Sequence, residues 1–332
     1  MKDIKPLKHD PHLGLIGAFG ILFAAILYIS AVITAPILRL FSIERDLNQQ
    51  LIWMSGFPFL LGLIFIVFDA LSLAPRRRQN RTIMNEVVNT EKVTVVLTAY
   101  NDESSIGLAV EDFLNHHKVA RVIVVDNNSK DGTSKVAKEA GAICVLETKP
   151  GYGQCVYRAL TEGSNYTDTE LVLLCEGDMT FRSDDIDKFL AYARHADVVN
   201  GTRIIEQLRQ PVTQLTSMMF YGNFVVGKLL ELKHLGKGTI SDVGTTYKLC
   251  RSKFLRENLE MFDPNVNLEF NAHFLEKILD SEFRLVEVPV TFHPRVGESK
   301  GGNVSNRRAL RVGFRMIAGI LFGWKLIASK EK

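Results

Sequence analysis

The chain has 332 residues, of which 46% are hydrophobic and 23% charged, with a formal net charge of +3. This length suits one large domain or two ordinary ones, the apolar content permits a packed core, and the charge is too small to indicate nucleic-acid binding. The cysteines show no CxxC pair and no metal-ligand spacing, so we expect buried small residues in a reducing compartment: Cys144, Cys155, Cys175 and Cys250.

Two apolar stretches near the N-terminus are long enough to cross a membrane. Residues 13–38 carry no charge, and residues 51–73 carry only Asp69. About 20 apolar residues span the hydrocarbon core as a helix, and a cleaved signal peptide would have a shorter apolar region without a second span. We therefore predict two transmembrane helices within 13–74. Buried helices of a soluble protein are the alternative.

Basic residues flank both ends of this predicted hairpin. Three lysines lie within residues 1–12, and four arginines lie within residues 75–92, whereas the connector SIERDLNQQ is short and slightly acidic. The positive-inside rule places both basic ends in the cytosol. We therefore expect a cytosolic tail over 1–12, a basic linker over 75–92 and a cytosolic domain after it, held at the plasma membrane or the endoplasmic reticulum.

Beyond the linker, short apolar runs alternate with helical patterns. Apolar runs of this kind are typical of strands covered on both faces of a parallel sheet, and they occupy residues 93–100, 121–126, 142–148 and 170–176. Helices are expected near 103–117, 131–140 and 152–164. The alternation predicts an α/β fold with a mostly parallel sheet, whose ligands bind beyond the carboxyl ends of the strands.

A short polar cluster follows each of these strands: AYNDE, DNNSKDG, KPGYGQ and EGD. Asp126, at a strand end, can accept hydrogen bonds from a nucleobase or a ribose. Gly151 and Gly153 allow a backbone to approach a ligand closely. Glu176 and Asp178 are hard oxygen ligands suited to Mg²⁺ or Mn²⁺ shared with a diphosphate. Four polar loops at one edge of a sheet predict a binding site.

An ordered series of motifs runs from Val93 to Lys300: TAYNDE, VVDNNSKDGT, KPGYGQ, CEGDMTF, NGTR, SDVGTTYKL, NLEF, EVPVTF and RVGESK. In order and spacing they resemble the family 2 glycosyltransferases with the GT-A fold, and most of all the polyprenyl-phosphate sugar transferases that include dolichol-phosphate mannose synthases. The resemblance implies a Rossmann-like nucleotide-sugar-binding domain over 93–303.

The resemblance also implies roles for the residues that match these motifs. The nucleotide sugar would be bound by Tyr100, Asn101, Glu103, Asp126, Lys149, Gly151, Gly153 and Glu176. The metal would be held by Glu176 and Asp178, and the phosphates of donor and acceptor by Arg203, Arg295, Ser299 and Lys300. The catalytic residues would be Asp178, Asp242 and Arg203, with Asp242 beside the acceptor. Glu269 lies in the NLEF motif, which matches the family pattern less closely, and is assigned no role.

The chain departs from the family pattern at three positions. Glu176 stands where the metal motif begins with Asp, Thr180 replaces a Gln that often follows, and Asn127 stands where a second Asp is frequent. Direct coordination of the metal and the choice between a UDP- and a GDP-linked donor therefore stay open. The QxxRW motif of processive polysaccharide synthases does not occur in this sequence, which favours transfer of a single sugar.

The resemblance implies inversion at the anomeric carbon by one in-line displacement. A polyprenyl monophosphate, with a second pKa of about 6, is largely ionised at neutral pH and needs little help from a base. We therefore expect Asp242 to orient the acceptor or assist the metal. If the acceptor were a sugar hydroxyl, a base would be needed, and Asp242 would be that base.

Two later apolar segments fit a lipid acceptor. Residues 212–235 predict either a core helix or an interfacial helix beside the entry of a prenyl chain. Residues 304–326 place Arg307, Arg311 and Arg315 on one helical face, and the apolar second half ends with Trp324, a residue type found at membrane interfaces. We expect residues 304–332 to form an amphipathic helix on anionic lipid.

The sequence therefore predicts an inverting glycosyltransferase that moves one sugar from a nucleoside-diphosphate sugar to a membrane polyprenyl phosphate, dolichyl or undecaprenyl, at the cytosolic face. The alternatives are a nucleotide-sugar-binding membrane pseudoenzyme or scaffold, and a glycosyltransferase with a non-prenyl acceptor. A homo-oligomer formed through the hairpin also stays open, and no nucleic-acid partner is expected.

Overall fold

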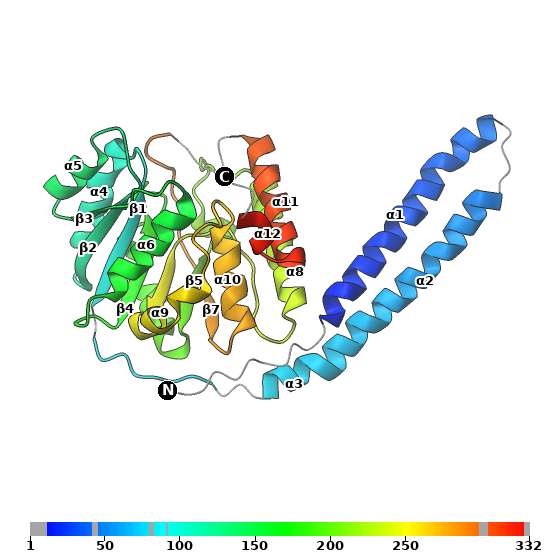
Figure 1. Cartoon of the computed structure of the whole chain (residues 1–332), viewed down its shortest axis with the longest axis horizontal. Helices are drawn as coiled ribbons and strands as arrows, with labels where there is room; N and C mark the ends of the chain where they lie inside the picture. Colours follow the sequence, from blue (N-terminus) through cyan, green and yellow to red (C-terminus); the bar gives the residue numbers. More distant parts are fainter. Residues whose placement is uncertain (1–11, 42–45, 80–82, 91, 299–304, 329–332) are drawn as a thin grey trace. The chain divides into compact units, whose positions relative to one another are not determined.

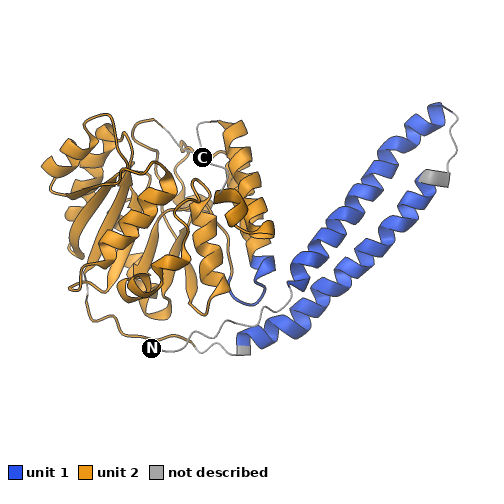
Figure 2. Ribbon diagram, in the orientation of Figure 1, with its two compact units in different colours: residues 1–82, 231–238 blue, residues 83–230, 239–332 orange. Residues whose placement is uncertain are grey.

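The computed structural model describes residues 12–41, 46–79, 83–90, 92–298 and 305–328 (Figure 1). Figure 2 shows two compact units in different colours. The hairpin unit comprises residues 1–82 and 231–238, and the α/β unit comprises residues 83–230 and 239–332.

The hairpin unit is built from two long apolar helices, α1 (Leu13–Leu40) and α2 (Asp46–Phe68). A π-helical turn (Asp69–Leu73) continues α2 into α3 (Ala74–Gln79). Residues 13–40 and 48–78 are long and apolar enough to cross a membrane. A Cβ atom at Gly17 would lie 2.4 Å from the carbonyl oxygen of Gly62, and the reverse holds at the same distance. Glycine at both positions therefore lets the two backbones meet, as in close-packed membrane helices.

Asp69, the single charge of the second apolar stretch, is buried at the end of α2 and is fully paired. Its carboxylate accepts hydrogen bonds from the backbone N–H of Gly14, at 2.6 Å, and from Nη1 of Arg77, at 2.7 Å. The same Arg77 nitrogen donates to the carbonyl oxygen of Leu235, at 2.7 Å. The charge thus joins the first turn of α1, the end of the α2 helix and the segment 231–238.

The α/β unit is organised around a seven-stranded sheet with the strand order β3-β2-β1-β4-β6-β5-β7. Strand β6 runs antiparallel to β4 and β5, and the other neighbours are parallel. The strands are β1 (Val93–Ala99), β2 (Val119–Asp126), β3 (Ile143–Leu146), β4 (Leu171–Glu176), β5 (Val198–Thr202), β6 (Lys248–Arg251) and β7 (Leu285–Pro289). The predicted α/β fold with a mostly parallel sheet is confirmed.

Helices cover both faces of the sheet, as Figure 1 shows. One core cluster joins the sheet to α4 (Glu103–Leu114), α5 (Thr133–Glu139) and α7 (Ile186–Tyr192). The other joins it to α6 (Tyr152–Ser164), α9 (Ser252–Asn258) and α10 (Phe270–Asp280). The other α-helices described in this unit are α8 (Ser217–Lys233), α11 (Asn306–Phe322) and α12 (Lys325–Ala328).

One expectation about the sheet is wrong. The apolar run 142–148 was expected to be covered on both faces, but β3 lies at the edge of the sheet and pairs only with β2. Ile143 is 44% exposed and Leu146 is 54% exposed. The apolar composition of this run therefore does not reflect burial on both faces.

Two expectations about the C-terminal helix are also wrong. Trp324 is 6% exposed, and its Nε1 donates to Oε2 of Glu276 at 2.5 Å, so it is a core residue and not an interfacial one. Arg315 does not continue the exposed basic face, because its Nε lies 2.6 Å from Oε1 of the buried Glu269. Burial of a carboxylate without a partner is costly, which favours drawing this arginine inward.

The start of α6 generates a test of this packing. A Cβ atom at Gly153 would lie 1.9 Å from the carbonyl oxygen of Val266 and 2.7 Å from that of Pro264. Overpacking of this kind costs about 1–3 kcal/mol. We expect Gly153→Ala to lower the midpoint of thermal unfolding by roughly 3–10 °C, measured by differential scanning fluorimetry on detergent-solubilised protein.

The matched control is Gly222→Ala in α8, where an added Cβ atom would meet nothing within 4 Å. This variant should unfold at or slightly above the wild-type midpoint, because alanine favours a helix interior. Equal midpoints for the two variants would contradict the close approach at Gly153.

Candidate active site

The loops that follow β1, β2 and β4 begin side by side at the carboxyl ends of these strands. Ala99 is the register partner of Asp126, and Thr98 is the partner of Glu176. Asn127 then ties the loop after β2 to the loop after β3. Its Nδ2 donates to the carbonyl oxygen of Lys149 at 2.7 Å, and its Oδ1 accepts from the backbone N–H of Gly151 at 3.0 Å. The convergence of polar loops expected from the sequence is therefore present.

These loops enclose a cavity of about 420 Å³, called here the loop cavity, most of whose lining residues are polar or charged. Its polar lining includes Tyr100, Asp102, Lys130, Glu176, Asp178 and Arg295. Cations and carboxylates both face this space, so it suits a polar, charged ligand.

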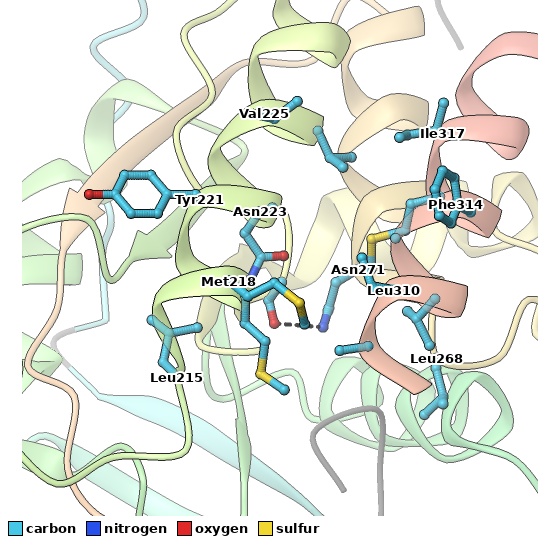
Figure 3. A pocket seen from close by; sticks show the side chains of 18 of the residues that line it. Leu215, Met218, Tyr221, Asn223, Val225, Leu268, Asn271, Leu310, Phe314 and Ile317 are labelled. Atoms are coloured by element: carbon cyan, nitrogen blue, oxygen red, sulfur yellow. Dashed lines mark hydrogen bonds between the residues drawn. The ribbon is translucent and has the colours of Figure 1, made fainter. Parts of the chain in front are cut away.

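A second cavity of about 440 Å³, called here the helix cavity, lies between α8 and α11. Figure 3 shows side chains of α8, such as Met218, facing those of α11, such as Leu310 and Phe314. Most of the lining is apolar, and its polar members include Glu176, Arg203, Asn223, Asn271 and Arg295. The two cavities share Tyr152, Glu176, Leu268 and Arg295, so they meet at these residues.

Glu176 and Asp178 lie together where the cavities meet. Oε1 of Glu176 accepts a hydrogen bond from Oγ1 of Thr246 at 2.7 Å. Oδ1 of Asp178 accepts from the backbone N–H and Oγ1 of Thr180, at 3.0 and 2.6 Å. Burial, and after it the neighbouring Asp178, raises the pKa of Glu176 to about 7. A positive charge bound between Glu176 and Asp178 would therefore offset the repulsion of their carboxylates.

A divalent cation fits this pair of hard oxygen donors. Within the part of the chain that the structure describes, no group of three or more His, Cys, Asp or Glu residues could hold a metal ion. Glu176 and Asp178 would therefore hold Mg²⁺ or Mn²⁺ only together with other ligands, such as phosphate oxygens of a substrate.

Arg295 binds two carboxylates of the loop cavity at once. Its Nη1 lies 2.9 Å from Oδ2 of Asp178, and its Nη2 lies 3.2 Å from Oδ1 of Asp102. The guanidinium side chain is only 14% exposed, so the two pairs are largely shielded from water. Arg295 thus places a fixed positive charge at the junction of the two cavities.

Asp242 is bound to Arg203 and lines neither of the two cavities. Nε of Arg203 lies 2.7 Å from Oδ2 of Asp242, Nη2 lies 2.8 Å from Oδ1, and the backbone N–H of Gly244 donates to Oδ1 at 2.9 Å. Burial acts to raise the pKa of Asp242, but Arg203 and these hydrogen bonds outweigh it, so the pKa lies below its usual value. Such a carboxylate is a weak base and a strong anchor for Arg203.

Three residues expected to bind the nucleotide sugar form hydrogen bonds to the segment after β2. Oδ1 of Asn101 accepts from the backbone N–H of Lys130 at 2.7 Å, and Oε2 of Glu103 accepts from that of Gly132 at 3.0 Å. Oδ1 of Asp126 accepts from the backbone N–H of Ser129 at 3.0 Å, and its Oδ2 accepts from Oγ of Ser134 at 2.6 Å. None of the three lines the loop cavity, and these bonds hold the loop that encloses it. Their binding of the nucleotide sugar stays a prediction.

The remaining expected site residues fall into three groups. Tyr100 and Gly151 line the loop cavity. Lys149 and Gly153 do not line it, and the close approach at Gly153 is to the protein backbone and not to open space. Ser299 and Lys300 lie outside the described residues.

A hydrogen-bonded group beside Glu176 was not predicted. Oη of Tyr152 lies 2.5 Å from Oγ1 of Thr246, and Nδ2 of Asn271 donates to the same Oη at 3.0 Å. Thr246 in turn holds Glu176. Tyr152 and Thr246 lie within the quoted motifs KPGYGQ and SDVGTTYKL, so the motifs contained a signal for them, but only the fold shows that they meet.

Comparison with known proteins gives a family match for half of the chain. Residues 94–259 match the family model described as Glycosyl transferase family 2. An uncharacterized glycosyltransferase of Mycobacterium tuberculosis is 28% identical over 241 residues, which cover 72% of this chain and 99% of that protein. A dolichyl-phosphate hexose transferase of Haloferax volcanii is 26% identical over 211 residues, 63% of this chain and 86% of that protein.

Among solved structures, glucosyl-3-phosphoglycerate synthase from Mycobacterium tuberculosis, in complex with Mn²⁺, UDP-glucose and phosphoglyceric acid, is similar with a TM-score of 0.48 and 16% sequence identity. The match covers 75% of this chain and 82% of that one.

The buried pair of Arg203 and Asp242 predicts strongly non-additive stability. Asp242→Asn leaves a buried guanidinium without its counter-charge, and breaking a buried pair in this way costs about 3–5 kcal/mol. We expect the double variant Arg203→Met, Asp242→Asn to regain most of that loss, because it removes the buried charge and keeps an acceptor for the N–H of Gly244. Chemical denaturation of the wild type, Asp242→Asn, Arg203→Met and the double variant measures how far the two single losses depart from additivity. A double variant whose loss equals or exceeds the sum of the two single losses would contradict it.

Proposed function

Because the chain belongs to glycosyl transferase family 2, we propose that it transfers one sugar from a nucleoside-diphosphate sugar to a polyprenyl phosphate in the membrane. The observation that carries this proposal is the meeting, at Glu176 and Arg295, of a cavity lined mostly by polar and charged residues and one lined mostly by apolar residues. The first suits a charged sugar donor and the second an apolar chain that ends in a phosphate.

The loop cavity would bind the UDP- or GDP-linked donor. Glu176 and Asp178 would hold Mg²⁺ or Mn²⁺ together with the donor diphosphate. When bound, the cation would neutralise the charge that develops on the departing nucleoside diphosphate. Tyr100 and Gly151 would contact the nucleotide, since both line this cavity.

The helix cavity would bind the acceptor. Its apolar walls come from residues such as Leu215, Met218 and Phe314, and Arg203 and Arg295 supply positive charge. Guanidinium groups are charged donors that attract phosphate oxygens, although part of each guanidinium here is bound to a carboxylate. The similarity to a dolichyl-phosphate hexose transferase supports a polyprenyl phosphate as the acceptor.

The reaction would be a single in-line displacement with inversion. An acceptor phosphate oxygen forms a bond to the anomeric carbon as the bond from that carbon to the diphosphate oxygen breaks. The phosphate needs no base, since its second pKa of about 6 leaves it largely ionised at neutral pH. This agrees with the geometry of Asp242, which holds Arg203 and has both oxygens occupied. We assign Asp242 the positioning of Arg203 on the acceptor phosphate.

The chain would work at the cytosolic face of a membrane. Its two apolar helices are long enough to cross the bilayer, and the arginines after α2 favour a cytosolic exit. Large apolar side chains of α8 and α11 are also exposed, Tyr221 at 64%, Val225 at 59% and Phe314 at 68%. We propose that these side chains contact the membrane beside the acceptor, although Arg315 and Trp324 do not.

A screen of radiolabelled UDP- and GDP-sugars against polyprenyl phosphate tests the function. The purified full chain, in detergent with Mg²⁺ or Mn²⁺, should move the label into the lipid phase for at least one donor. Label that appears only in water-soluble products would contradict the lipid acceptor. Neither transfer nor donor hydrolysis with any donor would instead support a nucleotide-sugar-binding pseudoenzyme.

A substitution that fills the helix cavity tests whether the acceptor binds there. Gly313 of α11 lines this cavity, and an added Cβ atom would meet nothing within 4 Å. We expect Gly313→Phe to lower transfer to the lipid by about tenfold or more through lost apolar contacts, with donor hydrolysis unchanged. Gly313→Ala, which adds one methyl group, should keep transfer near the wild-type rate.

A further inference from the structure

The first turn of α11 brings an unpredicted arginine, Arg308, to the loop cavity. The backbone N–H of Arg308 donates to Oγ of Ser305 at 3.3 Å, which caps the helix and fixes this turn. The side chain is exposed and lines the cavity together with Asp178 and Arg295. Within the described part of the chain, no carboxylate lies within ion-pair distance of Arg308.

The charges of the loop cavity indicate what Arg308 could bind. Three carboxylates line the cavity, those of Asp102, Glu176 and Asp178. Arg295 also lines it, but its guanidinium is already bound to Asp102 and Asp178. Arg308 is therefore a cation whose hydrogen-bond donors stay available to a ligand, and the fork of a guanidinium suits a phosphate group.

The same helix also forms a wall of the helix cavity. Leu310, Gly313, Phe314 and Ile317 line that cavity, and they follow Arg308 within three turns of α11. A ligand that holds Arg308 in the loop cavity therefore also restrains the wall of the second cavity.

We propose that Arg308 binds the diphosphate of the nucleotide sugar and thereby fixes α11 as a wall of the acceptor cavity, so that donor and acceptor bind cooperatively. This inference rests on the proposed function, which supplies the donor and acceptor classes. Coupling of this kind is reciprocal, so each ligand strengthens the binding of the other by the same factor.

The test compares nucleoside diphosphates with monophosphates. Titration calorimetry would measure the binding of UDP, GDP, UMP and GMP to the full detergent-solubilised chain with Mg²⁺ present. For the base that the wild type binds, Arg308→Ala should raise the Kd of the diphosphate about tenfold or more, the effect of losing a charge-assisted hydrogen bond. The Kd of the monophosphate should change less than about twofold, and Arg308→Lys should lie between.

Arg307 offers a matched control on the same turn. Arg307 lines neither of the two cavities. It lines a groove with Leu326 and Ile327, which adjoins the helix cavity at Leu310 and Phe314. Arg307→Ala removes the same charge from the chain, and the Kd of the diphosphate should stay at the wild-type value. An equal rise for both variants would mean that only the net charge matters, and would overturn the proposal.

The cooperative part is read from a second titration with farnesyl phosphate as a short prenyl phosphate. In the wild type it should tighten diphosphate binding by about fivefold or more, and in Arg308→Ala this factor should fall close to one. A factor that Arg308→Ala leaves unchanged, or an equal loss of mono- and diphosphate affinity, would overturn the proposal. Failure of sugar transfer in the radiolabel screen contradicts the proposed function but leaves the diphosphate comparison as a separate result.

Discussion

The site depends on one contact, the guanidinium of Arg295 between Asp102 and Asp178. It joins the loop after β1, the loop after β4 and the segment after β7, which come from distant parts of the chain. Three carboxylates line this cavity, and without Arg295 two of them, Asp102 and Asp178, would lose the cation bound to them. The pKa of Glu176, raised to about 7 by burial and by Asp178, shows that the region still favours added positive charge. A divalent cation would supply this positive charge, and a diphosphate bound with it would supply further ligands to the cation.

A second buried ion pair, Arg203 with Asp242, indicates different roles for these two expected catalytic residues. Both carboxylate oxygens of Asp242 accept hydrogen bonds from Arg203, and one also accepts from the backbone N–H of Gly244. The pKa of Asp242 is lowered. Asp242 therefore fixes the direction of a cation that lines the helix cavity. An acceptor that is already ionised makes a base unnecessary, so the geometry of this pair and the chemistry of a phosphate acceptor point to the same mechanism.

The sequence predicts the first half of the sheet, because strands buried between helices carry unbroken apolar runs, and β1, β2 and β4 lie where such runs were found. The strands β5, β6 and β7 were not predicted. The sequence does not tell which motif residues also hold their own loop, as Asp126 does through Ser129 and Ser134. Trp324 was misjudged because the chain turns back after Gly323, whose φ is +93°, and a periodic pattern does not contain that turn. Arg307 and Arg308 are identical in type and adjacent, so only the packing of α11 separates their surroundings.

The central claim is that Glu176 and Asp178 bind a divalent cation shared with the donor diphosphate. A titration of Mn²⁺ followed by electron paramagnetic resonance, in the presence of UDP or GDP, measures this most directly. The wild-type chain should bind one Mn²⁺, and the variant with alanine at both positions should bind it at least about tenfold more weakly, since both carboxylate ligands are gone. The same Mn²⁺ affinity in the two proteins would contradict the account.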